Sequence, residues 1–291
     1  MKKIKKKIIF FGGSSFASQD LINKLKKNYE LTNLSRKKVK GIDNIKFDIN
    51  NFEKHSIAKR ISNRSDYVFF FTSYVPLKEN KPCLPKCFNT NIFSLVSLLF
   101  HIKEKPKKII LASSISLYGK STLKILNEDS PVYPSSHYSI SKYIQENILR
   151  IFCNRNKIKF LSLRLGYVYG KNLSHKRIIK KLFLNIKNKK KFKVYNQNKF
   201  KFQLIHTRDI SNIIIKIFKK AEGTFNLINK DQTTIKDLIK VISKKVDMKA
   251  KYKNYNKPEK DKNYYYSSKK LLKKFNIKTN INLEDGISDL L

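Results

Sequence analysis

A tyrosine and a lysine four residues apart, Tyr138 and Lys142, are the residues in this sequence best suited to chemistry. Four residues make just over one helical turn, so the two side chains would share one face of a helix. A nearby ammonium group can lower the pKa of a phenol from about 10 toward neutral pH, and the phenol can then transfer protons. The spacing alone is weak support, because the chain has 15 tyrosines and 64 lysines and arginines.

The surroundings of Tyr138 and Lys142 strengthen the case that this pair does chemistry. A strand-like apolar run over 108–112 leads into Ser113 and Ser114, and the predicted helix with Tyr138 follows. Taken alone, Ser114 would be read as a strand-end serine that caps its own backbone. Next to Tyr138, we interpret it as a catalytic group.

Short apolar runs alternate with longer helix-like stretches through the first part of the chain. The runs predicted as buried strands are 8–11, 30–34, 46–48, 67–72, 109–112 and 160–164. The stretches predicted as helices between them include 20–27, 91–103 and 139–153. This alternation predicts an α/β fold, a Rossmann-like doubly wound parallel sheet with helices on both faces.

Beyond Gly170 the pattern loosens. The predicted elements there are helices over 178–188, 211–220 and 235–246 and an alternating segment over 192–205. We therefore predict a dinucleotide-binding domain over 1–168 and a smaller α/β substrate-binding part over 169–291. Some segments of the second part are expected to return to the first domain, with a cleft between the two.

The first predicted strand ends in a turn where a dinucleotide would bind. A helix follows this turn, and its unpaired N–H groups and positive dipole suit a pyrophosphate. Of the three glycines usual in such a turn only Gly12 remains, because Ser15 and Ser18 occupy the other two places. The loop residues expected to contact the cofactor are Gly12, Ser14, Ser15 and Phe16.

The second predicted strand ends at Ser35 and Arg36, where an acidic residue would normally hold the adenosine ribose. Arginine instead suits a 2′-phosphate, because its guanidinium offers several donors to phosphate. We favour NADP over NAD modestly, the alternative being an ordinary surface arginine. Asp48, after the third strand, is placed to meet the adenine, although Asp is also a common turn residue.

The net charge of +43 is extreme and would suit a nucleic acid or an anionic membrane. The lysines are spread along the whole chain rather than gathered in one stripe, so we predict no nucleic-acid and no membrane partner. No apolar run reaches the roughly 20 residues of a membrane span. The three cysteines do not form a zinc pattern, so no metal is assigned and a reducing, cytoplasmic location is expected.

Together these features resemble the extended short-chain dehydrogenase/reductase family, the NAD(P)-dependent nucleotide-sugar epimerases and dehydratases. The resemblance covers almost the whole chain. The motifs that carry it are the degenerate glycine turn, Asp48-Ile-Asn, Asn91, Ser113-Ser-Ile-Ser-Leu-Tyr-Gly119, Glu128-Asp-Ser-Pro, Tyr138-x-x-x-Lys142 with Glu146, Leu163-Arg-Leu-Gly-Tyr-Val-Tyr-Gly170, Leu204-Ile-His206 with Asp209, Gly223-Thr-Phe-Asn226-Leu and Leu-Glu-Asp-Gly286.

The resemblance implies roles for single residues. Tyr138 would be the acid/base acting on a sugar hydroxyl or its ketone, Lys142 would tune it and hold the nicotinamide ribose, and Ser114 would hydrogen-bond the reacting oxygen. Asn91 would lie at the cofactor. The substrate, a nucleotide sugar, would meet Tyr167, Lys201 and His206. A homodimer is usual among such proteins, often through the helices carrying Asn91 and Tyr138.

The chain departs from the family pattern on the substrate side. Tyr167 stands where relatives have an asparagine, and an arginine that grips the substrate diphosphate is missing before His206. Lys199 or Lys201 could replace that arginine as point charges. The sugar and the nucleotide cannot be read from the sequence.

Several reactions stay open. Dehydratases of the family have an Asp-Glu pair where this chain has Ile115 and Ser116, so dehydration is disfavoured. A 4-epimerase that oxidises and re-reduces a sugar through a keto intermediate is favoured narrowly over an NADPH-dependent keto-sugar reductase. A non-catalytic member that binds a nucleotide or RNA through its basic surface is the third alternative.

Overall fold

The structure is a computed structural model of the 291-residue chain. It describes residues 5–51, 53–54, 65–76, 83–102, 104–256 and 263–291.

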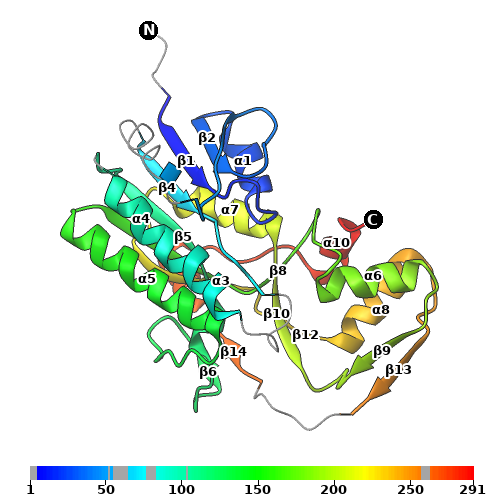
Figure 1. The fold of residues 1–291 in the computed structure, drawn as a ribbon. Coiled ribbons are helices and arrows are strands. Elements are labelled where there is room, and N and C mark those ends of the chain that lie inside the picture. Colours follow the sequence, from blue (N-terminus) through cyan, green and yellow to red (C-terminus); the bar gives the residue numbers. More distant parts are fainter. Residues whose placement is uncertain (1–4, 52, 55–64, 77–82, 103, 257–262) are drawn as a thin grey trace.

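A parallel sheet of seven strands forms the centre of the molecule (Figure 1). Its strands are β1 (Lys7–Phe11), β2 (Glu30–Ser35), β3 (Asp43–Lys46), β4 (Tyr67–Phe70), β5 (Lys108–Ser114), β7 (Lys159–Leu165) and β11 (Gly223–Leu227). They lie side by side in the order β11-β7-β5-β4-β1-β2-β3. The predicted doubly wound parallel sheet is thereby confirmed.

The inner strands are apolar on both faces, as expected where helices cover both sides of a sheet. Successive residues of β1 point to opposite faces, so Phe10 enters one core and Phe11 the other. Each phenylalanine stacks on its partner in β4: Phe10 on Phe69 and Phe11 on Phe70, both with ring centroids 4.8 Å apart. These pairs fix the register of the two strands.

Helices from distant parts of the chain cover the two faces. Those that flank the sheet are α1 (Gln19–Leu25), α3 (Leu84–Phe88), the π-helix η2 (Asn89–Phe93), α4 (Ser94–His101), α5 (His137–Arg155) and α7 (Thr207–Ile217). Helices α4 and α5 pack on the face that carries Phe11, whereas α1 and α7 pack on the face that carries Phe10 (Figure 1). None of the helices in the described part of the chain is long and apolar enough to cross a bilayer.

A second core lies beyond the carboxyl ends of the strands. Its elements are β8 (Tyr167–Tyr169), α6 (Ile178–Lys187), β9 (Phe192–Tyr195), β10 (Lys201–His206), β12 (Gln232–Thr234), α8 (Ile235–Val246), β13 (Tyr252–Tyr255) and α10 (Leu283–Ser288). Apolar faces of α6, α8 and α10 meet there, with Phe183, Leu238 and Ile287 fully buried. Four smaller elements of the described residues remain: the 3-10 helix η3 (Ile115–Tyr118), β6 (Ile125–Leu126), β14 (Tyr265–Tyr266) and α9 (Lys269–Phe275).

Two predicted elements differ from the structure. The strand predicted at 46–48 is instead Asp43–Lys46, because Phe47 and Ile49 are buried just past its end rather than within it. The alternating segment predicted over 192–205 is two strands, β9 and β10, that belong to different small sheets. Asn196 turns the chain between them with a φ of 48°, a left-handed conformation that asparagine tolerates.

Candidate active site

The start of α5 places Tyr138 and Lys142. Ser136 and Ser139 form a reciprocal cap: Ser139 N–H donates to Ser136 Oγ (3.1 Å), and Ser136 N–H donates to Ser139 Oγ (2.9 Å). The helix therefore begins at His137. Tyr138 lies in its first turn, and Lys142 follows about one turn later on the same face.

Ser114 ends β5 and meets α5 from the sheet. Its Oγ accepts a hydrogen bond from Ser116 N–H (3.1 Å), which caps the short 3-10 helix η3 (Ile115–Tyr118). The Ser114 hydroxyl also lies close enough to the phenol of Tyr138 to lower the pKa of that group through hydrogen bonding. The backbone cap and the contact with Tyr138 thus occur together, and the predicted pair is side by side.

Burial raises the pKa of Tyr138 above its ordinary value, although hydrogen bonds with Ser114 and Ser73 and the positive charge of Arg177 act in the opposite direction. The predicted lowering of this pKa by Lys142 is therefore wrong for the structure described here. Ser73 and Arg177 were not singled out from the sequence. The sequence feature that could have identified Ser73 is its position: it is a short polar residue just after a buried strand, at the edge of the sheet where the strand ends meet.

Lys142 is buried, with 1% of its surface exposed. Its Nζ donates to the backbone oxygen of Ala112 (2.7 Å) and to Oε1 of Gln145 (2.5 Å). Burial lowers the pKa of Lys142 to about 7, against the opposing attraction of Glu146. Burial therefore favours the neutral form of this lysine far more than water does.

Asn91 joins the same region from the π-helix η2. Its Oδ1 accepts from Tyr74 N–H (2.7 Å) and from Ser73 Oγ (3.2 Å), and its Nδ2 donates to Ser141 Oγ (2.8 Å). The side chain is fully buried. Asn91 thus ties the segment after β4 to α5, and it positions Ser73 beside Tyr138.

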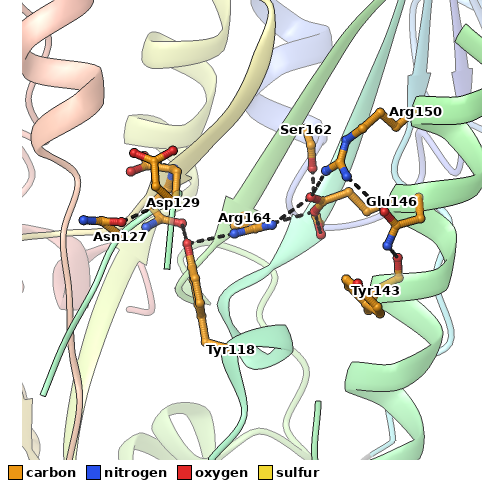
Figure 2. A network of polar contacts seen from close by, with 12 residues as sticks. Tyr118, Asn127, Asp129, Tyr143, Glu146, Arg150, Ser162 and Arg164 are labelled. Atoms are coloured by element: carbon orange, nitrogen blue, oxygen red, sulfur yellow. Dashed lines mark hydrogen bonds and ion pairs between the residues drawn. The ribbon is translucent and has the colours of Figure 1, made fainter. Parts of the chain in front are cut away.

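A buried ion pair lies one turn beyond Lys142 (Figure 2). Glu146 accepts from Arg164 Nη2 (2.9 Å), Ser113 Oγ (3.0 Å) and Ser162 Oγ (2.9 Å). Burial alone would raise the pKa of Glu146, but Arg164 and the serine hydroxyls lower it overall. This network holds β5, β7 and α5 at a fixed spacing. Ser113, one of its members, directly precedes Ser114.

Tyr118 extends the network toward the edge strand. Its hydroxyl accepts from Arg164 Nη1 (3.0 Å) and donates to Asn226 Oδ1 (2.9 Å) on β11. Figure 2 shows Tyr118, Arg164 and Glu146 in one line of contacts. Every buried polar atom of this line has a partner, which keeps the polar interior stable.

The glycine turn keeps a tight backbone conformation despite its serines. Gly12 has a φ of +80°, and a Cβ there would lie 2.6 Å from Thr72 Oγ1, so only glycine suits this position. Ser18 Oγ donates back to Gly13 O (2.8 Å), and Ser15 Oγ pairs with Ser18 Oγ (3.2 Å). The serine hydroxyls are therefore bonded within the turn. Ser14 and Phe16 of the same turn are half-buried.

The ends of β2 and β3 enclose a basic hollow of about 250 Å³. It is lined by Ser35, Arg36, Lys37, Lys38, Asn44, Ile45 and Lys46. Arg36 is exposed, and no carboxylate lines this hollow. Asp48 lies after β3, half-buried, with its Oδ1 accepting from Asn50 N–H (3.0 Å).

The residues predicted for the substrate lie on two paired strands, β8 and β10. Tyr167 follows β7, beside the end of β5, and its half-exposed ring packs edge-on against Phe202 (5.2 Å). Lys201 is exposed at the start of β10. His206 is buried at the other end of that strand, with Nδ1 accepting from Arg208 N–H and Nε2 lying 3.2 Å from Asp289 Oδ2.

Known proteins resemble this chain in sequence. The model of the NAD dependent epimerase/dehydratase family matches residues 8–229. An ADP-L-glycero-D-manno-heptose-6-epimerase of Brachyspira hyodysenteriae is 25% identical over 75% of this chain and 74% of its own.

Solved structures show the same fold. A UDP-glucose 4-epimerase of Thermotoga maritima, solved with UDP-glucose, has a TM-score of 0.86 and 21% identity, covering 98% of this chain and 97% of its own. A UDP-glucose 4-epimerase of Thermus thermophilus, solved with NAD, has a TM-score of 0.85 and 17% identity, with the same coverage of both chains. The family match spans most of the chain, and we conclude that this protein belongs to the NAD-dependent epimerase/dehydratase family of oxidoreductase-type enzymes.

Proposed function

We propose that the protein is a nucleotide-sugar epimerase of the 4-epimerase type that oxidises and re-reduces one sugar hydroxyl. The observation that carries this proposal is the Ser114 hydroxyl close to the Tyr138 phenol, with Lys142 one turn further along α5. The family supplies the reaction class. The relatives whose names specify UDP-glucose 4-epimerase support the choice of epimerisation.

The site residues have distinct tasks in this reaction. NAD(P), held by the Gly12 turn and α1, supplies the hydride chemistry when bound. Tyr138 is protonated at neutral pH, because burial raises its pKa, and its phenol can donate that proton to a keto oxygen. Oxidation comes first in an epimerase, so the phenol must lose its proton to solvent before the phenolate takes up the proton of the sugar hydroxyl. Re-reduction then returns that proton to the keto oxygen, and Ser114 Oγ hydrogen-bonds the same oxygen in both directions.

The cofactor preference is part of the proposal. Arg36 and the lysines that line the hollow between β2 and β3 offer several positive charges where a ribose 2′-phosphate would lie. This favours NADP over NAD. The same feature supports a second candidate function, an NADPH-dependent keto-sugar reductase that releases its oxidised cofactor.

A homodimer is the proposed assembly. Phe93, Val96 and Phe100 expose 53%, 47% and 84% of their surfaces along η2 and α4, and Tyr143 and Ile151 are exposed on neighbouring α5. An apolar face can pair with itself about a two-fold axis, whereas the positive surface elsewhere repels a second copy. Sedimentation of the wild type should show a dimer that Phe100→Glu converts to monomer; a wild-type monomer would refute this.

Tyr138→Phe tests the catalytic role. The substitution removes the hydroxyl while keeping the ring, so turnover of UDP-sugars should fall by at least about 10³-fold. Cofactor affinity, measured by calorimetry, should change little. Tyr143→Phe, on an exposed turn of the same helix, is the matched control. Full activity of Tyr138→Phe would remove the proposed mechanism.

Native mass spectrometry separates the two candidate reactions. An epimerase returns its hydride within one catalytic cycle, so retained cofactor favours epimerisation. Freely exchanging NADPH, consumed in proportion to product, would show that the reaction is a reduction rather than an epimerisation.

A further inference from the structure

Two cysteines lie side by side next to the amino end of α5. Cys83 is the residue immediately before α3. Cys87 lies within α3, one helical turn after Cys83. Their Sγ atoms are 3.7 Å apart, with the Cys87 thiol donating toward the Cys83 sulfur. Cys87 is fully buried, whereas 7% of Cys83 remains exposed.

A histidine completes the cluster. The Nδ1 atom of His137 lies 3.9 Å from Cys83 Sγ, and His137 is the first residue of α5. An imidazole at this distance can take up the thiol proton, and the thiolate is the reactive form of cysteine. Burial and the hydrogen bond to Cys83 raise the pKa of Cys87 to about 12, so Cys87 keeps its proton. The two thiols therefore differ, and Cys83 is the one prepared to react first.

The geometry is compatible with a disulfide. Residues four apart in a helix have Cα atoms about 6 Å apart, within the range that disulfides span. Closing the bond to about 2.05 Å requires the two sulfurs to approach by roughly 1.7 Å. Rotation about the two Cα–Cβ bonds supplies most of such a movement.

We propose that Cys83 and Cys87 form a redox modification site in which hydrogen peroxide oxidises the two thiols to a disulfide. The Cys83 sulfur attacks one peroxide oxygen and the O–O bond breaks; the departing hydroxide takes the proton that the thiol gives up and leaves as water, so that Cys83 becomes a sulfenic acid. The Cys87 sulfur then attacks the Cys83 sulfur, the S–O bond breaks, and a second water leaves with the Cys87 proton. Two electrons pass from the sulfurs to the peroxide.

The position of this site gives the oxidation a consequence. Helix α3 packs against α5, His137 directly precedes Tyr138, and Cys87 is near enough to Tyr138 to act on it electrostatically. A disulfide would shift the groups around the phenol, so turnover should fall in the oxidised protein and return with dithiothreitol. This consequence rests on the proposed function, whereas the disulfide itself does not.

The test uses the full chain and hydrogen peroxide. After oxidation the protein is denatured, its free thiols are alkylated, and its mass is measured. Disulfide formation predicts a mass loss of about 2 Da before alkylation and alkylation of Cys153 alone. Because Lys86 lies between the two cysteines, trypsin cuts there and the disulfide appears as a linked pair of peptides.

Variants of single cysteines sharpen the result. Cys153→Ser should keep the mass loss, since Cys153 is buried elsewhere in the core. Cys87→Ser should abolish it and leave a sulfenic acid on Cys83 that dimedone traps. Alkylation of all three thiols after peroxide, or oxidation of Cys153 as fast as Cys83, would overturn the proposal.

Activity is followed in the same samples. An unchanged turnover rate in fully disulfide-linked protein would refute the proposed effect of the disulfide on Tyr138. Absence of turnover in the reduced protein would instead count against the proposed function, because the mass loss would still appear.

Discussion

Replacing Lys142 by methionine should change how the stability of the protein depends on pH. Methionine has a similar length and no titratable group, so it removes the buried charge without opening a large cavity. The pKa of Lys142 is about 7 in the folded protein, whereas the ordinary value is 10.5. Between these two pH values the unfolded chain binds a proton that the folded protein has released.

The free energy of unfolding of the wild type therefore contains a term that rises with pH. The cost of burying the charged lysine is fully present below about pH 7 and is gone above about pH 10.5. The difference of 10.5 − 7 = 3.5 pKa units, at 1.36 kcal/mol each, corresponds to about 5 kcal/mol. Between about pH 7 and about pH 9.5 the accessible part is about 3 kcal/mol.

Urea unfolding of wild type and Lys142→Met at several pH values measures this term. The variant also loses the hydrogen bonds to Ala112 O and Gln145, which is a nearly pH-independent offset, so the slope of the difference isolates the charge. The stability of the variant relative to wild type should fall by about 3 kcal/mol from about pH 7 to about pH 9.5. Parallel curves would show that Lys142 keeps an ordinary pKa, and the electrostatic account of the site would be refuted.

The ion pair and the cofactor hollow give two further predictions. Glu146→Gln should lower the free energy of unfolding by about 3–5 kcal/mol, because it leaves the Arg164 charge buried without its partner. In urea titrations, Glu146→Gln combined with Arg164→Met should recover part of this loss. A loss below about 1 kcal/mol in the single variant would contradict the role of the pair. Arg36→Ala should weaken NADP binding by about 1.5–3 kcal/mol in calorimetry while NAD binding changes little, with exposed Lys40→Ala as the control; equal weakening of both cofactors would rule out the 2′-phosphate role.

The strands of the fold could be predicted because burial leaves a local pattern in the sequence. Continuous apolar runs such as 8–11 mark strands covered on both faces. The same pattern misplaces the edge strand, since Phe47 and Ile49 are apolar and buried but lie past Lys46, the last residue of β3. Apolar periodicity reports burial, not backbone pairing, so the ends of edge strands are the least predictable.

The site could be predicted only as far as its residues share a motif. Tyr138, Lys142 and Ser114 follow a recognisable spacing, and the structure brings Tyr138 and Ser114 into contact. The pKa of Tyr138 could not be predicted, because it depends on burial and on Ser73, which lies in the segment after β4, far from Tyr138 in the sequence. Non-local contacts of this kind leave no periodic trace.

The position of β11 has a consequence for how the molecule can be divided. This strand comes late in the chain, yet it pairs with β7 along the whole of its length and forms the border of the central sheet. A fragment that stopped at residue 168 would leave the backbone of β7 unpaired along an apolar border, which is a template for aggregation. During synthesis, the strands made first must therefore wait for residues made much later before the central sheet is complete.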